Sequence, residues 1–313
     1  MARPGLVLDA IFERHDTGPG HPERPARLQS IRRSIEAAAL LERFELVAPE
    51  AADDALLELC HDADYVRRVE AAVAGGERLL DSMDTAICPE SARVARLAVG
   101  SLVALCRRTV RGELAGGFAA IRPPGHHAER DLAMGFCLFD NVAIAARYLQ
   151  EREGLERVLI VDWDVHHGNG TQHLFEDDPS VFFFSLHQWP LYPGTGARDE
   201  RGRGAGLGAT LNCPLPPGTG DAGFLAALTD DLVPAAERFR PQFVLLSAGF
   251  DAHRADPLAQ LEVTTQAYGE ATRIVREIAR RHAEGRFVST LEGGYDLDAL
   301  GGSVVEHLRV LAS

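Results

Sequence analysis

The chain alternates short apolar runs with amphipathic segments along most of its 313 residues. Strand patterns that alternate with helical patterns predict an α/β fold with a mainly parallel sheet. The candidate strands are 117–121, 158–164, 181–186, 243–249 and 287–291, together with a short first strand that ends at Asp9. The candidate helices are 90–110, 141–151, 222–239 and 265–283. Continuous apolar runs such as Val-Leu-Ile-Val indicate strands that are buried on both faces.

A polar, often Gly-rich segment follows the apolar part of four predicted strands, after Ile121, Val161, Leu246 and Leu291. In open parallel sheets, ligands gather at the carboxyl ends of the strands. We therefore expect four groups of reactive side chains, far apart in sequence, to converge in space. The Gly- and Pro-rich stretch 191–220 is predicted to be a long loop. A loop of this length in a compact domain is more often functional than idle, which makes it a candidate for one wall of a pocket.

Asp162, Asp164 and His166 alternate along the sequence. Side chains in an extended backbone have a period of two, so these three would point the same way and suit a divalent metal. Asp251 follows another buried strand and adds a third carboxylate. Three protein ligands with room for water is the arrangement of catalytic zinc, although Asp-rich sites also accept harder metals. Taken alone, acidic residues at strand ends are as often caps of the following helix.

His126 and His127 follow a Pro-Pro-Gly turn, and Tyr295 follows two glycines. Amide hydrolysis needs a base to activate water and an acid to protonate the departing amine, and a histidine pair beside a metal can supply both. A phenol at the same place can donate to the oxyanion of a tetrahedral intermediate. Taken singly, adjacent histidines are more often incidental, and a tyrosine beside a turn is more often a core residue.

The composition limits the partners of this chain. Its formal charge of −14 argues against nonspecific nucleic-acid binding, because phosphate contacts need a basic face. The five cysteines are scattered without a C-x-x-C pair, which favours reduced thiols over a disulfide framework or a thiolate zinc site. The sequence has no run of about 20 apolar residues, the length that a membrane span requires, and its first residues lack the apolar segment of a signal peptide. These features predict a cytoplasmic protein with no direct nucleic-acid or membrane partner.

Five motifs resemble, in order, those of zinc-dependent histone deacetylases, and most closely those of the class II and bacterial amidohydrolase branch. They are Arg122-Pro-Pro-Gly-His-His127, Gly135-Phe-Cys137, Asp162-Trp-Asp-Val-His-His-Gly-Asn-Gly-Thr171, Gly249-Phe-Asp-Ala-His253 and Leu291-Glu-Gly-Gly-Tyr295. The segment from His21 to Pro25 also matches the start of such enzymes. The resemblance covers nearly the whole chain, and it implies that residues 1–313 form a single deacetylase catalytic domain. The implied architecture is the three-layer arginase/deacetylase fold, with about eight mainly parallel strands and helices on both faces.

The resemblance also implies the catalytic groups. One catalytic zinc ion would be bound by Asp164, His166 and Asp251, and it would polarise the acetyl carbonyl and lower the pKa of its water. His127 would be the general base, or base and acid in turn, and Tyr295 would stabilise the oxyanion.

Two further residues would support the histidine pair. His126 would be a charged partner held by Asp162. Asn169 stands where some branches of the family carry aspartate. Because an amide cannot raise the pKa of an imidazole as a carboxylate does, His127 should favour its neutral form.

A narrow channel for a lysine stem is also implied by the resemblance, with walls formed by Gly135, Phe136, Tyr192, Leu258 and Gly294. Leu258 aligns with a rim position that is glutamate in polyamine-selective relatives. Because a neutral leucine gives a second ammonium no counter-charge, polyamine specificity is not favoured. Structural potassium or sodium ions are also implied. One site would use carbonyl and hydroxyl oxygens of Asp162, Asp164, His166, Ser185 and Leu186, and a second would use Phe175 and Val181.

The predicted substrate is an acetylated lysine in a protein or peptide, and a small acetylated amine is the alternative. A dimanganese ureohydrolase shares the fold, but it needs extra Asp and His ligands that we do not find in the sequence. A non-catalytic acyl-lysine-binding module would be expected to lack Tyr295 or a metal ligand, and all of them are present. The sequence leaves the oligomeric state open.

Overall fold

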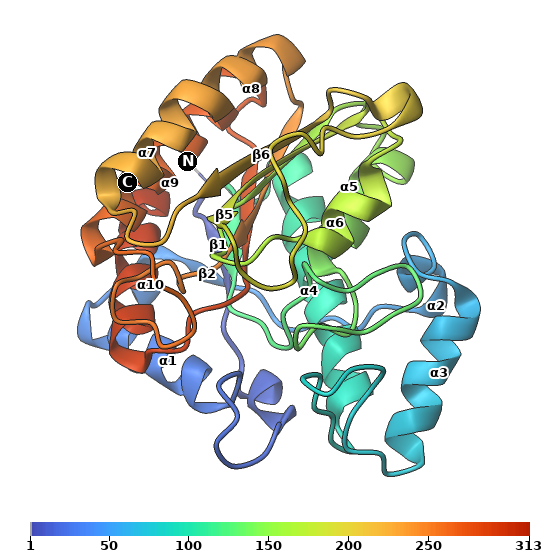
Figure 1. Ribbon diagram of the computed structural model, residues 1–313. Coiled ribbons are helices and arrows are strands. Elements are labelled where there is room, and N and C mark those ends of the chain that lie inside the picture. Colours follow the sequence, from blue (N-terminus) through green and yellow to red (C-terminus); the bar gives the residue numbers. More distant parts are fainter. Residues whose placement is uncertain (1) are drawn as a thin grey trace.

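Residues 2–313 are described by a computed structural model, in which they form an eight-stranded sheet of order β2-β1-β3-β8-β7-β4-β5-β6 (Figure 1). The strands are β1 (Gly5–Val7), β2 (Glu45–Leu46), β3 (Gly117–Ala119), β4 (Val158–Asp162), β5 (Val181–Gln188), β6 (Thr210–Leu215), β7 (Phe243–Ala248) and β8 (Phe287–Leu291). All neighbouring strands are parallel. The predicted α/β class and the implied parallel sheet are confirmed.

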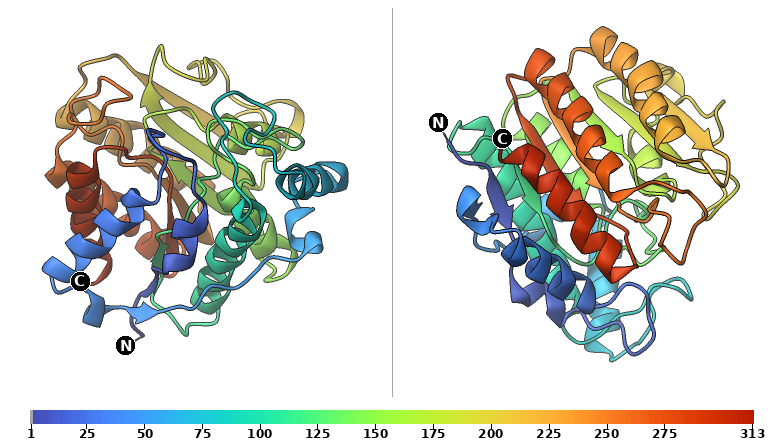
Figure 2. Two further views of the ribbon diagram at one scale, coloured as in Figure 1. Left: turned by 90° about the horizontal axis from the view of Figure 1, so that it is seen from below. Right: turned by 90° about the vertical axis from the view of Figure 1, so that its left-hand side faces the viewer.

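Helices cover both faces of this sheet (Figures 1 and 2). The α-helices are α1 (Ala26–Ala37), α2 (Asp54–Leu57), α3 (Ala63–Ala74), α4 (Ser91–Val110), α5 (Asn141–Glu151), α6 (Asn169–Phe175), α7 (Asp221–Ala226), α8 (Val233–Phe239), α9 (Thr265–His282) and α10 (Leu297–Leu311). Short 3-10 helices are η1 (Ala10–Arg14), η2 (Leu41–Arg43) and η3 (Gly204–Gly206), and η4 (Ala227–Leu232) is π-helical. The helices α1, α10, α9 and α8 pack in succession on one face, and α4 packs with α5 on the other.

The central strands are buried along their whole length. Every residue of β4, β7 and β8 is buried, which is the burial expected of parallel strands covered on both faces. Two helix N-termini beside the carboxyl ends of the strands, those of α5 and α10, are capped by side chains. Asp140 accepts a hydrogen bond from Ala143 N at 2.9 Å, and Asp296 accepts one from Ala299 N at 2.9 Å. The caps fix where α5 and α10 begin next to the polar strand-end segments.

Most predicted element boundaries lie close to the observed ones, and 287–291 matches β8. The strand predicted over 158–164 ends earlier, at Asp162, and the strand predicted over 181–186 continues to Gln188. The helix predicted over 222–239 is interrupted by the π-helical turn η4, after which α8 begins.

The prediction of a continuous loop over 191–220 is wrong for Thr210–Leu215, which form β6 at the edge of the sheet. Pro214 lies within this strand. Proline is tolerated on an edge strand because one side of the strand needs no ladder donor. Pro214, which obscured this strand in the sequence, is therefore compatible with its edge position.

The four polar segments follow β3, β8, β7 and β4, which are consecutive neighbours in the sheet. Their carboxyl ends therefore meet at one edge, as predicted from the sequence. In the described part of the chain, residues 2–313, no helix combines the length and apolar character needed to cross a membrane.

Candidate active site

Three side chains from two of these segments converge at the carboxyl ends of the strands. Asp164 and His166 follow β4, Asp251 follows β7, and their ligand atoms all lie within 4.8 Å of one another. His166 Nδ1 lies 3.1 Å from Asp164 Oδ1 and 3.2 Å from Asp251 Oδ2. Backbone donors orient both carboxylates: Val165 N donates to Asp251 Oδ1 and Gly293 N donates to Asp164 Oδ2, at 2.9 Å and 2.7 Å.

The chemistry of this group fits a divalent cation. Burial, together with the neighbouring Asp164 charge, raises the pKa of Asp251 to about 7. Burial lowers the pKa of His166, but the two carboxylates more than reverse this and raise it to about 10. Asp251 Oδ2 is buried and, within residues 2–313, makes no hydrogen bond. Two buried carboxylates and an inward-facing imidazole nitrogen are thus a donor set whose charge a metal would balance.

Asp162 does not belong to this group, which corrects the expectation that a strand would align Asp162, Asp164 and His166. The strand β4 ends at Asp162, and the backbone then turns, with Asp164 N donating to Asp162 Oδ1 at 3.1 Å. Asp162 Oδ2 instead faces the His126 ring. The period of two applies to an extended strand, and this segment leaves the strand before Asp164.

His126 and His127 lie beside the candidate metal-binding group of Asp164, His166 and Asp251, with 4.0 Å between their ring centroids. His126 Nδ1 lies 2.9 Å from Asp162 Oδ2, and His127 Nδ1 lies 2.7 Å from Asn169 Oδ1. Asn169 Nδ2 donates to Glu129 Oε1 at 2.6 Å, so the amide oxygen must face His127. His127 Nδ1 is therefore the protonated nitrogen, which leaves Nε2 free to accept a proton.

The two imidazoles differ in charge. Burial lowers the pKa of His126, but the carboxylates of Asp162 and Asp164 raise it well above the usual value. Burial and the neighbouring His126 charge lower the pKa of His127 well below that value. At neutral pH the pair therefore combines a charged His126 with a neutral His127, the states needed to stabilise negative charge and to accept a proton.

Aromatic rings lie beside these groups and beside Tyr295. The Tyr192 ring lies edge-on to the His127 ring at 5.2 Å between centroids, and the Phe136 ring lies 6.0 Å from that of Tyr295. Gly135 leaves no room for a side chain, since a Cβ there would lie 2.3 Å from His127 Cδ2. Of the predicted channel residues, Gly135 and Tyr192 therefore border His127, and Phe136 lies beside Tyr295.

The other two predicted channel residues lie near the Tyr295 backbone. Gly294 precedes Tyr295 and has a φ of +121°. Asp256 Oδ2 accepts a hydrogen bond from Tyr295 N at 2.7 Å, and Asp256 Oδ1 accepts one from Leu258 N at 3.0 Å. The Asp256 carboxylate thus connects the loop that carries Leu258 to the backbone of Tyr295.

The histone deacetylase domain family matches residues 21–311 of this chain. The chain belongs to the histone deacetylase family. A histone deacetylase-like amidohydrolase of Pseudomonas aeruginosa is 40% identical over 300 residues, which cover 94% of this chain and 78% of that protein. The Homo sapiens protein Polyamine deacetylase HDAC10 is 41% identical over 301 residues, which cover 92% of this chain and 44% of that protein. The crystal structure of the HDA15 HD domain matches with a TM-score of 0.92 and 37% identity, covering 99% of this chain and 88% of that one.

These similarities make the protein a hydrolase of the deacetylase and amidohydrolase type. The geometry at the carboxyl ends of the strands agrees with amide hydrolysis, because it combines a candidate metal-binding group, a neutral imidazole and a phenol.

A buried ion cluster, which sequence reasoning did not single out as a site, supports the Tyr295 loop of this deacetylase. Arg122 and Arg27 both contact the Glu23 carboxylate, and all three residues are fully buried. Burial would raise the pKa of Glu23, but Arg122 and Arg27 hold it at about 2. Arg27 also donates to Gly294 O at 2.7 Å, and its guanidinium lies 5.0 Å from the centre of the Tyr295 ring. Arg122 and Glu23 lie within the recognised motifs, but the motifs do not show that they meet.

The residues predicted to bind monovalent cations lie on the β4–β5 side of the deacetylase site. Asp162 and Ser185 are register partners on β4 and β5, and Leu186 follows Ser185. Phe175 ends α6, and Val181 begins β5. The two predicted cation sites stay predictions.

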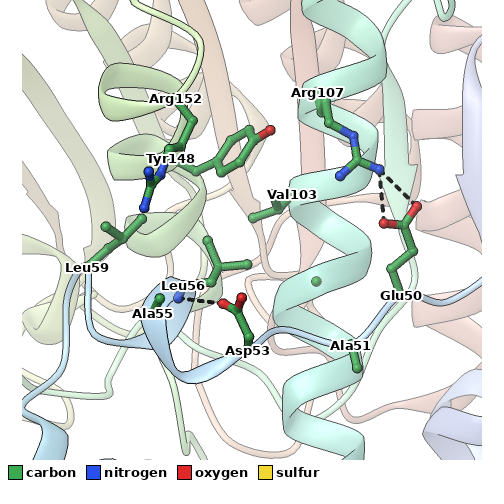
Figure 3. Close-up of a pocket in the computed structure, with 11 residues that line it drawn as sticks. Glu50, Ala51, Asp53, Ala55, Leu56, Leu59, Val103, Arg107, Tyr148 and Arg152 are labelled. Atoms are coloured by element: carbon green, nitrogen blue, oxygen red, sulfur yellow. Dashed lines mark hydrogen bonds and ion pairs between the residues drawn. The ribbon is translucent and has the colours of Figure 1, made fainter.

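A separate hollow of about 350 Å³ lies between α2, α4 and α5 (Figure 3). The Tyr148 ring and Arg152 extend from the end of α5, while Arg107 on α4 pairs with Glu50 at 2.9 Å. The helix α5 starts beside the catalytic motifs and ends at this hollow. The hollow therefore lies near the amino ends of the strands and is not part of the deacetylase site.

Proposed function

We propose that this deacetylase hydrolyses the acetyl amide on the ε-nitrogen of lysine in proteins or peptides, with residues 1–313 acting as one catalytic domain. The observation that carries the proposal is the contact of His126 with Asp162 and of His127 with Asn169, next to the Asp164, His166 and Asp251 group. This arrangement supplies a proton acceptor and an electrostatic stabiliser within one buried site.

In this proposal Asp164, His166 and Asp251 hold one zinc ion, which fits a site with three protein ligands. When bound, zinc would act as a Lewis acid toward the substrate carbonyl and lower the pKa of water. Among residues 2–313, these are the one group of three or more acidic, histidine or cysteine side chains that converges in this way. The dimanganese ureohydrolase alternative, which needs a second metal set, is therefore not supported.

His127 accepts the proton of the attacking water at Nε2, because its Nδ1–H is already donated to Asn169. The same nitrogen then returns a proton to the departing amine, so the histidine acts as base and acid in turn. His126 stays charged through its contact with Asp162 and stabilises the developing negative charge. Burial raises the pKa of Tyr295 well above its usual value, so its phenol stays protonated and can donate to the oxyanion.

The proposed substrate stem is aliphatic, because Tyr192 and Phe136 offer apolar ring surfaces beside His127 and Tyr295. Small acetylated amines are the alternative substrates, and the similarity to a relative named as a polyamine deacetylase supports this alternative. Leu258 gives a second ammonium no counter-charge, which favours lysine over polyamines. A non-catalytic acyl-lysine-binding module is disfavoured because Tyr295 and the metal-binding group are present. The structural potassium or sodium ion and the cytoplasmic location remain parts of the proposal.

The proposal is tested by hydrolysis of a fluorogenic acetyl-lysine peptide by metal-free protein, with and without added zinc. N-acetylated diamines and monoamines are assayed in parallel. Zinc-dependent turnover of the peptide above that of the amines supports lysine deacetylation. Turnover of amines alone would select the alternative, and binding of the acetyl-lysine peptide without turnover would favour a binding module.

A further inference from the structure

Glu292 lies at the junction between the strand that leads to Tyr295 and the turn that carries His126 and His127. It follows the last residue of β8, and its side chain is fully buried. One carboxyl oxygen, Oε2, accepts hydrogen bonds from Gly125 N at 2.7 Å and from His126 N at 3.3 Å. The other, Oε1, lies 3.4 Å from the hydroxyl of Ser247.

The two backbone amides depend on this side chain. Within residues 2–313, neither Gly125 N nor His126 N donates to a backbone carbonyl. The turn is also tightly enclosed, because a Cβ on Gly125 would lie 2.5 Å from Asn141 N. A buried amide that loses its acceptor pays a desolvation penalty, so the turn would shift to find another partner. Both imidazoles are attached to this turn.

The backbone of Glu292 connects to the other half of the site. Its carbonyl oxygen accepts a hydrogen bond from Arg27, the residue whose guanidinium also holds Gly294 and lies over the Tyr295 ring. Glu292 therefore contacts the histidine turn through its side chain and the tyrosine loop through its main chain.

We propose that Glu292 is a positioning residue. Through its Oε2 acceptor it fixes the position of the His126–His127 turn relative to the Tyr295 loop. This inference rests on the proposed deacetylase function. The role belongs to the acceptor atom and does not require a negative charge. Burial raises the pKa of Glu292 to about 8, and a neutral carboxyl still has a carbonyl oxygen for both amides.

Two substitutions distinguish the effect of the hydrogen-bond acceptor at position 292 from the effect of its negative charge. Glu292→Gln keeps an sp² oxygen at the same distance, and its NH₂ can donate to Ser247. Glu292→Met keeps the length of the side chain but offers no comparable acceptor. Ser289→Ala is the matched control, because Ser289 is also buried on β8 but contacts Gly117 O and His307 instead of the catalytic turn.

We expect kcat to fall at least about tenfold in Glu292→Met, with KM little changed, because a shift of about 1 Å in a catalytic group can cost up to about a hundredfold. Glu292→Gln should stay within about threefold of the wild type, and Ser289→Ala should keep kcat even if its melting temperature falls. A tenfold or larger loss in folded Glu292→Gln would overturn the proposal, since charge and not the acceptor would then matter. So would a rise in KM with kcat unchanged in Glu292→Met.

A second measurement does not depend on turnover. The Nδ1 proton of His126, hydrogen-bonded to the buried Asp162, should give a downfield proton NMR signal, assigned by its loss in His126→Gln. The signal should move in Glu292→Met and stay in place in Glu292→Gln and Ser289→Ala. An unmoved signal in Glu292→Met would overturn the positioning role. Wild-type protein that is inactive on all acetylated substrates would instead contradict the proposed function, and the NMR comparison would still decide the role of Glu292.

Discussion

The rings of His126 and His127 lie 4.0 Å apart, yet their Nδ1 atoms face partners of different charge, Asp162 and Asn169. A carboxylate favours the imidazolium form and an amide does not, so two neighbouring histidines acquire pKa values that move in opposite directions. Environments that separate the pKa values of paired groups are a common sign of acid–base assignment in an active site.

Asn169→Asp should move the acidic limb of the kcat/KM profile to higher pH by about one to three units. A carboxylate next to Nδ1 raises the pKa of His127, and an imidazole that must be neutral to accept a proton then becomes protonated at a higher pH. The substitution is best made together with Glu129→Gln, because Asn169 Nδ2 donates to Glu129 and two carboxylates would repel each other. Glu129→Gln alone is the control. A limb that does not move would contradict the assignment of His127 as the base.

Tyr295→Phe should reduce kcat by about a hundredfold or more, the usual effect of removing one donor to an oxyanion. The peptide assay with zinc-loaded protein measures this loss, and bound zinc should be unchanged. Tyr148→Phe is the matched control, since Tyr148 lies at the hollow of Figure 3 and its hydroxyl donates to Glu153. Equal losses in both variants would show a general destabilisation and no specific role for the Tyr295 hydroxyl.

Asp251→Asn should weaken zinc binding strongly, because it removes one of the two carboxylates of the metal-binding group. Zinc at about 100 times its Kd should stabilise the wild type by about 2.7 kcal/mol, and the variant by much less. Thermal unfolding with and without zinc, together with elemental analysis of bound metal, measures the effect. Asp140→Asn serves as the control, since Asp140 is buried and caps α5 outside this group. Undiminished zinc binding by Asp251→Asn would remove Asp251 from the ligand set.

Leu258→Glu should raise kcat/KM for an N-acetylated diamine relative to the acetyl-lysine peptide. A carboxylate at this position would attract the second ammonium of the diamine, a contact worth up to about fivefold at a partly exposed site. Leu258→Gln, which introduces a side chain of similar size without the charge, isolates the contribution of charge. If both variants change the ratio equally, the position acts through shape alone.

The unfolding free energy should decrease as the pH falls below neutrality, in part because of His307. Burial lowers the pKa of this histidine to about 3, whereas an unfolded histidine titrates near 6.5. Between these values the unfolded chain binds the proton and the folded chain does not. This contribution to stability is therefore complete above pH 6.5 and is lost progressively as the pH falls toward 3. It amounts to about 2 kcal/mol between pH 7 and pH 5.

His307→Gln should flatten this part of the pH dependence, measured by urea unfolding at pH 7, 6 and 5. Glutamine cannot titrate, but it can still bond to Thr272 and Ser289, the present partners of the ring. A variant with the same slope as the wild type would show that other buried histidines, such as His15 and His61, dominate the proton uptake.

The strand-end motifs allowed much of the site to be predicted, because parallel strands must bring their carboxyl ends to one edge. Asp164, His166 and Asp251 do converge, and Asp162 and Asn169 do contact His126 and His127. The edge strand β6 was missed because Pro214 and its glycine-rich surroundings resemble a loop. The alignment expected for Asp162 with Asp164 was also wrong, because the strand ends between them.

The sequence by itself determined the α/β class, the order of the motifs and the kinds of chemical group that they contain, since these depend on local periodicity and residue type. The strand order that makes β3, β8, β7 and β4 neighbours was decided by tertiary packing. So were the contacts of Glu292 with the histidine turn and of Arg27 with the Tyr295 loop, which join residues more than 160 and 260 positions apart. Such contacts depend on how buried polar groups find partners across the folded chain, and no local pattern along the sequence records that choice.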